Sequence, residues 1–116
     1  MVLKYTAKND SYYIERSIEE IDRILLYSKG LTIIELHNNQ AILDAIIFRM
    51  IQMVEQIERI SDDFKLVHSE IDWIDIKGFR NRLVHDYGNV DFEFVYNALK
   101  YDIPELKEQL IKLLFD

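Results

Sequence analysis

Apolar residues recur at helical spacing along most of the chain. The first run of the pattern consists of Ile14, Ile18, Ile21 and Leu25. Because these positions fall on one side of a 3.6-residue turn, they predict an amphipathic helix from about Ser11 to Ser28. Asp10 or Ser11 suits its N-cap, and Gly30 lies where a helix stop is expected.

A short turn and a long helix are predicted next. Thr32 and Glu35 have the spacing of a capping box, in which each residue satisfies a backbone donor of the first turn. Asn38 or Asn39 then suits the N-cap of a helix that ends near Ser61.

The long helix has two apolar stripes. One consists of Ile42, Ala45, Ile46, Met50, Met53, Ile57 and Ile60, and the other of Leu43, Ile47, Ile51 and Val54. A helix of a small bundle needs one stripe for the core, so the second predicts either a surface for a partner, such as another copy, or a central helix packed on all sides. Arg49 falls within the first stripe, where we expect a buried pair with a glutamate, with a role in lining a site as the alternative.

Capping residues also divide the second half of the chain. Ser61 is expected to cap a short segment that runs through Ile71. Asp72 is expected to cap a helix that begins at Trp73 and stops at Gly88.

A final helix is expected to start at Asp91, with Val90 and Val95 spaced as a hydrophobic staple. Pro104 should kink or break it near Asp102, because proline lacks the amide hydrogen and clashes with the preceding turn. No segment alternates as a strand does. The predicted fold class is all-α: an up-and-down bundle of four main helices, with an additional short helical segment and a kinked or broken last helix.

Composition narrows the class of protein. With 116 residues and 49% hydrophobic content, one globular domain is expected. The chain has no cysteine, which excludes disulfides and thiolate metal sites. No apolar run approaches the roughly 18 residues of a membrane span, and the first ten residues lack the apolar core of a signal peptide, so a soluble cytoplasmic protein is expected. Because the formal net charge is -7, any contact with nucleic acid must come from a local cationic patch.

Such a patch occurs in the stretch GFRNRLVHDYG, residues 78 to 88. The predicted core stripe of this helix is Ile76, Phe79, Leu83 and Val84, which leaves Lys77, Asn81, Arg82 and His85 toward the other side. Asn81 and His85 share a helix face, so an amide and an imidazole can meet one ligand there. Arg80 can hold an anionic oxygen, and Tyr87 lies two turns beyond it. The group suits phosphate chemistry, although cations near a helix C-terminus are also simply favoured by the helix dipole.

Other polar positions predict no site. His37 and His68 stand alone, without a second ligand at metal-binding spacing, so no metal is expected. Glu19, Glu20 and Asp22 are interpreted as a solvated helix face.

Four stretches carry a resemblance to a known family. They are SIEEIDRI, AIIFRMIQMVEQIERIS, EIDWIDIKGFRNRLVHDYGNVDFEFVY and YDIPELKEQL. In the third, Arg80, Asn81, His85 and Tyr87 fill a signature of Arg, a polar residue, a short spacer, His, any residue and Tyr. The chain thereby resembles the HEPN superfamily, and within it the HepT-like ribonuclease toxins encoded beside a minimal nucleotidyltransferase.

The resemblance implies one HEPN-like helical domain over residues 1–116, a homodimer with facing signature motifs, and a metal-independent endoribonuclease without a cofactor. Arg80, Asn81 and His85 would be catalytic: His85 as base or acid, Arg80 stabilising the oxyanion and Asn81 positioning a single-stranded RNA. Arg82 and Lys77 would bind the substrate.

The partner nucleotidyltransferase would act as antitoxin, and in this family it can transfer AMP to the tyrosine at position Tyr87. A structural role for Tyr87, stacked on Arg80, remains open. Two other interpretations also remain: a non-catalytic helical substrate-binding subunit of a nucleotidyltransferase, and an adaptor bundle that does not bind nucleic acid.

Overall fold

The structure is a computed structural model that describes residues 9–85 and 91–115, except the side chains of Val84 and His85. Its elements are α1 (Asp10–Ser28), α2 (Ile33–Asn38), α3 (Gln40–Glu58), α4 (Asp62–Val67), α5 (Trp73–His85), α6 (Phe92–Asn97), the π-helical turn η1 (Ala98–Asp102) and α7 (Ile103–Phe115). No strand occurs among these residues, so the predicted all-α fold class is confirmed.

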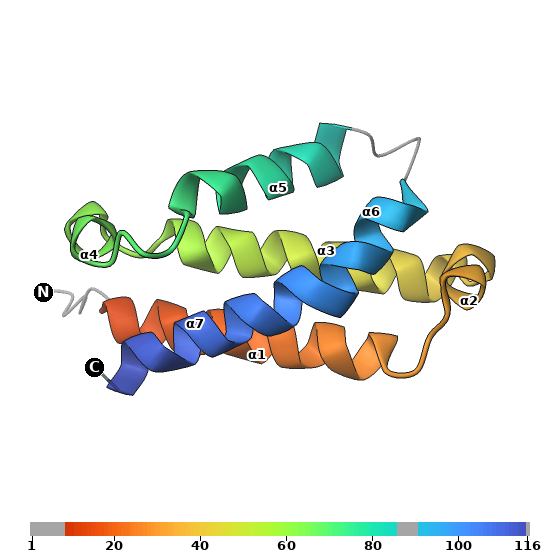
Figure 1. Ribbon diagram of the computed structural model, residues 1–116, viewed down its shortest axis with the longest axis horizontal. Helices are drawn as coiled ribbons and strands as arrows, with labels where there is room; N and C mark the ends of the chain where they lie inside the picture. The colour runs from red at the N-terminus through yellow and green to blue at the C-terminus, as the bar shows by residue number, and fades with distance from the viewer. Residues whose placement is uncertain (1–8, 86–90, 116) are drawn as a thin grey trace, which may run out of the picture.

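The helices form a bundle around α3 (Figure 1). α1 packs along α3, and α7 packs on α1. α5 lies on another side of α3, and the short helices α2 and α4 lie near opposite ends of it (Figure 1). α3 therefore packs against three other helices, α1, α2 and α5.

Most helices start at the caps that the sequence predicts. The side-chain oxygens of Thr32, Asn39, Ser61, Asp72 and Asp91 each accept a hydrogen bond from a backbone amide three residues later. Glu35 completes the predicted capping box. The segment after Ser61 ends at Val67 rather than Ile71, while the predicted stop at Gly88 and the Val90 half of the staple lie outside the described residues.

The cap predicted for the first helix is wrong by one or two residues. Asn9, not Asp10 or Ser11, caps α1. The Asp10 carboxylate instead accepts hydrogen bonds from the Ser61 amide at 2.7 Å and its hydroxyl at 2.9 Å, and so joins the start of α1 to the start of α4. Gly30 follows the helix with a φ of +73°, which suits the predicted stop.

The last helix is kinked rather than broken. The backbone N–H of Ile103 donates to the carbonyl of Ala98, five residues earlier, so the turn η1 is wider than an α-helical turn. This wider turn lies directly before Pro104, whose ring would clash with the carbonyl of Lys100 in a regular helix. Because the wider turn avoids this clash, the helix continues through Pro104 into α7.

Both apolar stripes of α3 are buried within the chain. Ile46 and Met50 of the first stripe are fully buried, and so are Leu43 and Val54 of the second. The second stripe therefore belongs to the core, as in the alternative of a central helix, but α3 is not packed on all sides. Phe48 differs, since it lies on the outer face of α3 with 52% of its surface exposed.

Candidate active site

The first turn of α5 is held by α4 and its own cap. The carboxylate of Asp72 accepts from the amide of Asp75 at 2.9 Å. The indole N–H of Trp73 donates to the carbonyls of Lys65 at 3.2 Å and His68 at 3.0 Å. Since Trp73 thereby binds carbonyls at the end of α4, the corner between the two helices has a defined angle.

The other half of α5 is held by α6. The rings of Phe79 and Phe94 pack with centroids 5.5 Å apart, and Leu83 is buried in the core. The guanidinium of Arg82 lies 3.7 Å above the Phe94 ring and 3.3 Å from the carboxylate of Asp91, the α6 N-cap. These contacts hold residues 79–83 of α5 against the bundle.

A cleft of about 360 Å³ opens between α3 and α5. It is lined by Val54, Glu55, Glu58 and Arg59 of α3 and by Lys77, Arg80 and Asn81 of α5. The structure thus brings three of the predicted site residues to one place. We call this place the α3–α5 cleft.

The cations of this cleft have no ion-pair partner in the described part of the chain. Arg59, Lys77 and Arg80 form no ion pair with a described carboxylate, whereas the remaining arginines all do. Two carboxylates, Glu55 and Glu58, offset part of the charge, so the lining carries one net positive charge. The guanidinium donors of Arg80 are therefore free to bind an anionic oxygen.

Arg82 does not line the cleft, although the sequence groups it with the other site residues. Arg80 and Arg82 lie about 200° apart around the axis of an ideal helix, so they face different neighbours. Arg82 engages Asp91 through one terminal nitrogen, and its side chain is 53% exposed. His85 is the last residue of α5; its side chain and Tyr87 lie outside the described residues.

Glu55, Glu58 and Arg59 were not predicted as site residues. Their spacing of three and four residues places them on one face of α3, and this much can be predicted from the sequence. Nothing in the pattern, however, tells which helix lies opposite that face. Only the packing of α5 against α3 brings them beside Arg80.

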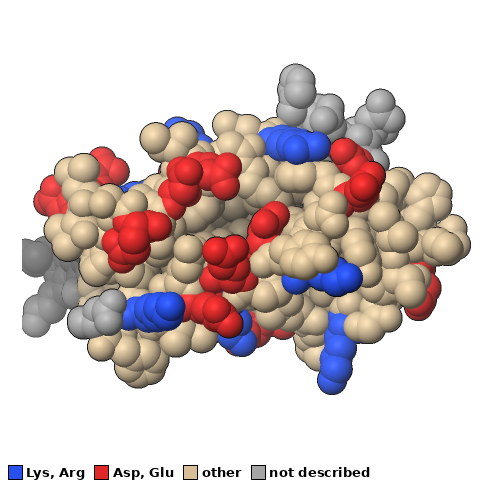
Figure 2. Space-filling model, in the orientation of Figure 1, with Lys and Arg blue, Asp and Glu red and all other residues tan. Residues whose placement is uncertain are grey.

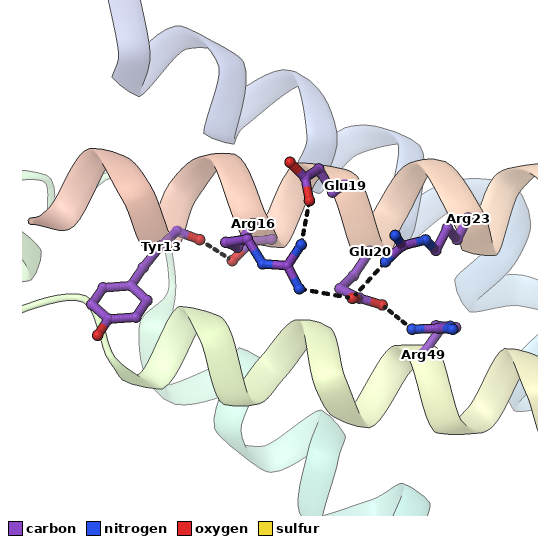
Figure 3. A network of polar contacts seen from close by, with 7 residues as sticks. Tyr13, Arg16, Glu19, Glu20, Arg23 and Arg49 are labelled. Carbon is purple, nitrogen blue, oxygen red and sulfur yellow. Dashed lines mark hydrogen bonds and ion pairs between the residues drawn. The ribbon is translucent and has the colours of Figure 1, made fainter. Parts of the chain in front are cut away.

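A second group of arginines surrounds Glu20 on α1 (Figure 3). The Glu20 carboxylate is only 3% exposed and lies 3.0 Å from Arg23, 3.3 Å from Arg49 and 3.7 Å from Arg16. The predicted buried pair of Arg49 with a glutamate is thus confirmed. The interpretation of Glu20 as solvated is wrong, because it faces α3.

The remaining acidic residues of that run are exposed, as predicted. Glu19 is exposed and pairs with Arg16, and Asp22 is exposed and lies 2.7 Å from Lys107 of α7. These surface pairs cost little to break.

Two histidines, His37 and His68, pack on aromatic rings. The ring of His37 lies 4.3 Å from that of Phe92, and His68 lies 4.3 Å from Phe64 and 3.3 Å from Glu70. Within residues 9–85 and 91–115, no group of three or more His, Asp or Glu residues could hold a metal ion. None of the helices in the same ranges is long and apolar enough to span a bilayer.

The chain is similar to known ribonucleases. Residues 14–113 match the family model described as ribonuclease HepT-like. A candidate RNase of Methanocaldococcus jannaschii is 30% identical over 85% of this chain and 82% of its own length. A second candidate RNase of that organism is 31% identical over 83% of each chain.

A probable ribonuclease HepT of Thermococcus cleftensis is 35% identical over 58% of this chain and 62% of its own. No solved structure matches the chain significantly.

Proposed function

We propose that this chain, which belongs to the HepT-like ribonuclease family, is a metal-independent endoribonuclease that cleaves single-stranded RNA at the α3–α5 cleft. Its membership confirms the family that the sequence resembles. One observation of the structure carries the location. Arg80 has no described carboxylate partner and lies beside Asn81 and Lys77 in a single cleft. A phosphate of the RNA backbone would supply the missing anion.

The proposed reaction is an internal transesterification. The ribose 2′-oxygen attacks the adjacent phosphorus as its proton passes to a base, the bond to the 5′-oxygen breaks, and that oxygen receives a proton from an acid. The products are a 2′,3′-cyclic phosphate and a 5′-hydroxyl end. His85 would serve as base or acid, because an imidazole exchanges protons near neutral pH. Arg80 would stabilise the charged phosphorane, and Asn81 would position the substrate.

Two further cations would bind the RNA backbone. Lys77 lines the cleft one turn before Asn81 and forms no ion pair with a described carboxylate. Arg82 keeps donors beyond the one that engages Asp91, so an adjacent phosphate can contact it at the edge of the site.

We also propose that two copies pair with their clefts facing each other. Phe48 supports this arrangement, because it lies seven residues before Glu55 and therefore on the same face of α3, about 10 Å along the axis. An exposed aromatic side chain beside the cleft is suited to pack on a second copy.

As in toxin-antitoxin modules of this family, a minimal nucleotidyltransferase would neutralise the enzyme. Transfer of AMP from ATP to the Tyr87 hydroxyl, with release of pyrophosphate, would add a phosphate and an adenine seven residues after Arg80. This negative group would repel RNA and obstruct the cleft.

The central test is RNA cleavage in excess chelator. We expect the wild type to cut single-stranded RNA, and not the same sequence with 2′-deoxyribose, whereas Arg80→Ala and His85→Ala should lose at least about a hundredfold in rate. Lys112→Ala, an exposed cation of α7, is the matched control and should keep full activity.

Equal cleavage by all variants would exclude this mechanism. Cleavage that needs an added metal would exclude metal independence. If the wild type cuts no RNA, one of the two non-catalytic interpretations holds instead: a subunit that presents a substrate to a nucleotidyltransferase, or an adaptor bundle.

The proposed modification needs its own experiment. The chain is produced together with the proposed nucleotidyltransferase partner, and its intact mass is compared with that of Tyr87→Phe. One added AMP on the wild type, absent from Tyr87→Phe, is expected. The same adduct on Tyr87→Phe would show that another residue is the acceptor.

A further inference from the structure

A second hollow lies between α5 and the last helix, η1 and α7. It has a volume of about 270 Å³ and an apolar floor to which Met53, Phe79 and Ile103 contribute. Its lining also includes five carboxylates: Glu70, Asp72, Asp75, Asp102 and Glu105. We call this hollow the acidic groove.

Of the five carboxylates of the acidic groove, only Glu70 has an ion-pair partner among the described residues. No lysine or arginine lines the groove, and Asp75, Asp102 and Glu105 form no ion pair with a described cation. Figure 2 shows acidic side chains gathered over α5 and the last helix on the face turned to the viewer. A groove of this charge repels the phosphates of RNA and attracts cationic groups.

The carboxylates are too dispersed to bind a single metal ion. No group of three or more acidic or histidine residues in the described ranges could hold one. The groove therefore favours an occupant that carries several separate positive charges. Its floor also requires an apolar group, because water in contact with Phe79 and Ile103 is released when such a group enters.

A wider hollow of about 570 Å³ adjoins the groove beside α4. The two share Glu70, Ile71 and Asp72 as a common wall. Leu66 and Ile74 line the wider hollow, and they are 77% and 85% exposed. Large apolar side chains so exposed, next to a charged rim, are typical of surfaces that bind another protein.

We propose that the acidic groove and the adjoining hollow dock a cationic amphipathic segment of a partner protein. A large apolar side chain of this segment fills the groove over Phe79, and its lysines or arginines pair with Asp75, Asp102 and Glu105. A further apolar residue covers Leu66 and Ile74. The two hollows together are too long and too apolar for a small cation. Lys65 lines the wider one, but the combined lining keeps a net negative charge, which repels a nucleic acid.

This docking site does not depend on the proposed catalytic mechanism. On α5, the residues that line the α3–α5 cleft are Lys77, Arg80 and Asn81. Those that line the acidic groove are Asp75, Ile76 and Phe79. α5 thus presents a cationic side to one hollow and an acidic side to the other. Failure of RNA cleavage would leave the binding experiment below unaffected.

The test uses the full chain and a labelled synthetic peptide of about 15 residues, with lysine and arginine on one helix face and leucine and tryptophan on the other. Fluorescence polarisation should show micromolar binding. The triple variant Asp75→Asn/Asp102→Asn/Glu105→Gln should weaken binding about tenfold or more, since three ion pairs are lost. Glu15→Gln/Glu93→Gln/Glu108→Gln removes the same charge from exposed positions outside the groove and should change binding less than about twofold.

A single substitution adds a positive charge to the acidic groove and keeps every carboxylate. Gln109→Lys places a cation four residues after Glu105, a spacing that supports the helix, so α7 should stay folded. We expect it to weaken peptide binding severalfold as well. Chemical shifts of 15N-labelled protein should move at α4, α5 and α7 when the peptide is added.

Four results would overturn the proposal. The peptide does not bind; or the two triple variants weaken binding equally, which assigns it to overall charge; or a peptide of scrambled order, or spermidine, binds as well as the amphipathic one. Shift changes confined to the α3–α5 cleft would also overturn it.

Discussion

Arginines gather in two regions of this molecule, and the two regions differ in what balances their charge. On α1 and α3, Arg16, Arg23 and Arg49 surround the buried carboxylate of Glu20 (Figure 3). In the α3–α5 cleft, Arg59 and Arg80 lie without an ion-pair partner among the described residues. The first group is satisfied within the fold, whereas the second can bind an external anion.

The difference shows that arginines of one chain are separated by what balances their charge, and on this basis we propose a structural role for the first group and a ligand-binding role for the second. A buried carboxylate such as Glu20 is costly without its cations, so the cluster is held in place by the fold itself. Arg80 contributes little to such a balance and is available to a substrate. Arg82 lies between these cases, because it pairs with Asp91 but is half exposed.

The largest expected effect is on RNA cleavage, and it distinguishes the arginines of the α3–α5 cleft from those around Glu20. Arg80→Ala should lower the rate of single-turnover RNA cleavage about 10²- to 10³-fold, because a donor to the transition state is lost. Arg23→Ala, which removes an arginine of the Glu20 cluster, should leave the rate within about twofold per folded molecule. An equal loss in both would contradict the division into structural and substrate-binding arginines.

The next effect separates them by stability. Glu20→Gln should lower the free energy of unfolding by about 3 kcal/mol, because three arginines lose their buried anion. Urea denaturation measures the change. Glu19→Gln is the control: its carboxylate is exposed and pairs with Arg16 alone, so it should cost less than about 1 kcal/mol. A cost for Glu20→Gln as small as that of the control would show that the cluster contributes no stability.

Arg82→Ala should have a smaller and mixed effect. The loss of the Asp91 pair and of the contact with Phe94 should lower the free energy of unfolding by about 1 kcal/mol. For RNA cleavage, KM should rise while kcat changes little, since Arg82 would bind the substrate rather than the transition state. Arg82→Lys, which keeps the charge, should restore part of the RNA affinity. A fall in kcat equal to that of Arg80→Ala would instead make Arg82 a catalytic residue.

The smallest effect is on the salt dependence of RNA binding. Lys77→Ala should reduce the slope of log Kd against log salt by about 0.7, the value for one phosphate contact on a single strand. An uncleavable 2′-deoxy substrate allows the measurement with an active enzyme. Lys112→Ala should leave the slope unchanged. If both variants behave alike, Lys77 does not contact the RNA.

Local signals in the sequence predicted most of the helices. The capping residues Thr32, Asn39, Ser61, Asp72 and Asp91 act within three residues of themselves, so their roles follow from sequence spacing. The α1 cap was missed because Asp10 binds Ser61, 51 residues away. A side chain with a distant partner leaves no local signal of that partner.

The candidate site divides in the same way. The sequence by itself predicted that Lys77, Arg80 and Asn81 belong to one site, although helical spacing grouped Lys77 and Asn81 with Arg82 and His85 rather than with Arg80. It also determined the family. Only the tertiary structure decided that Glu55, Glu58 and Arg59 lie opposite them, that Glu20 is buried among three arginines, and that Arg82 faces Asp91. Helical periodicity defines which residues share a face, but the element that packs against that face depends on how the whole bundle buries its apolar surface.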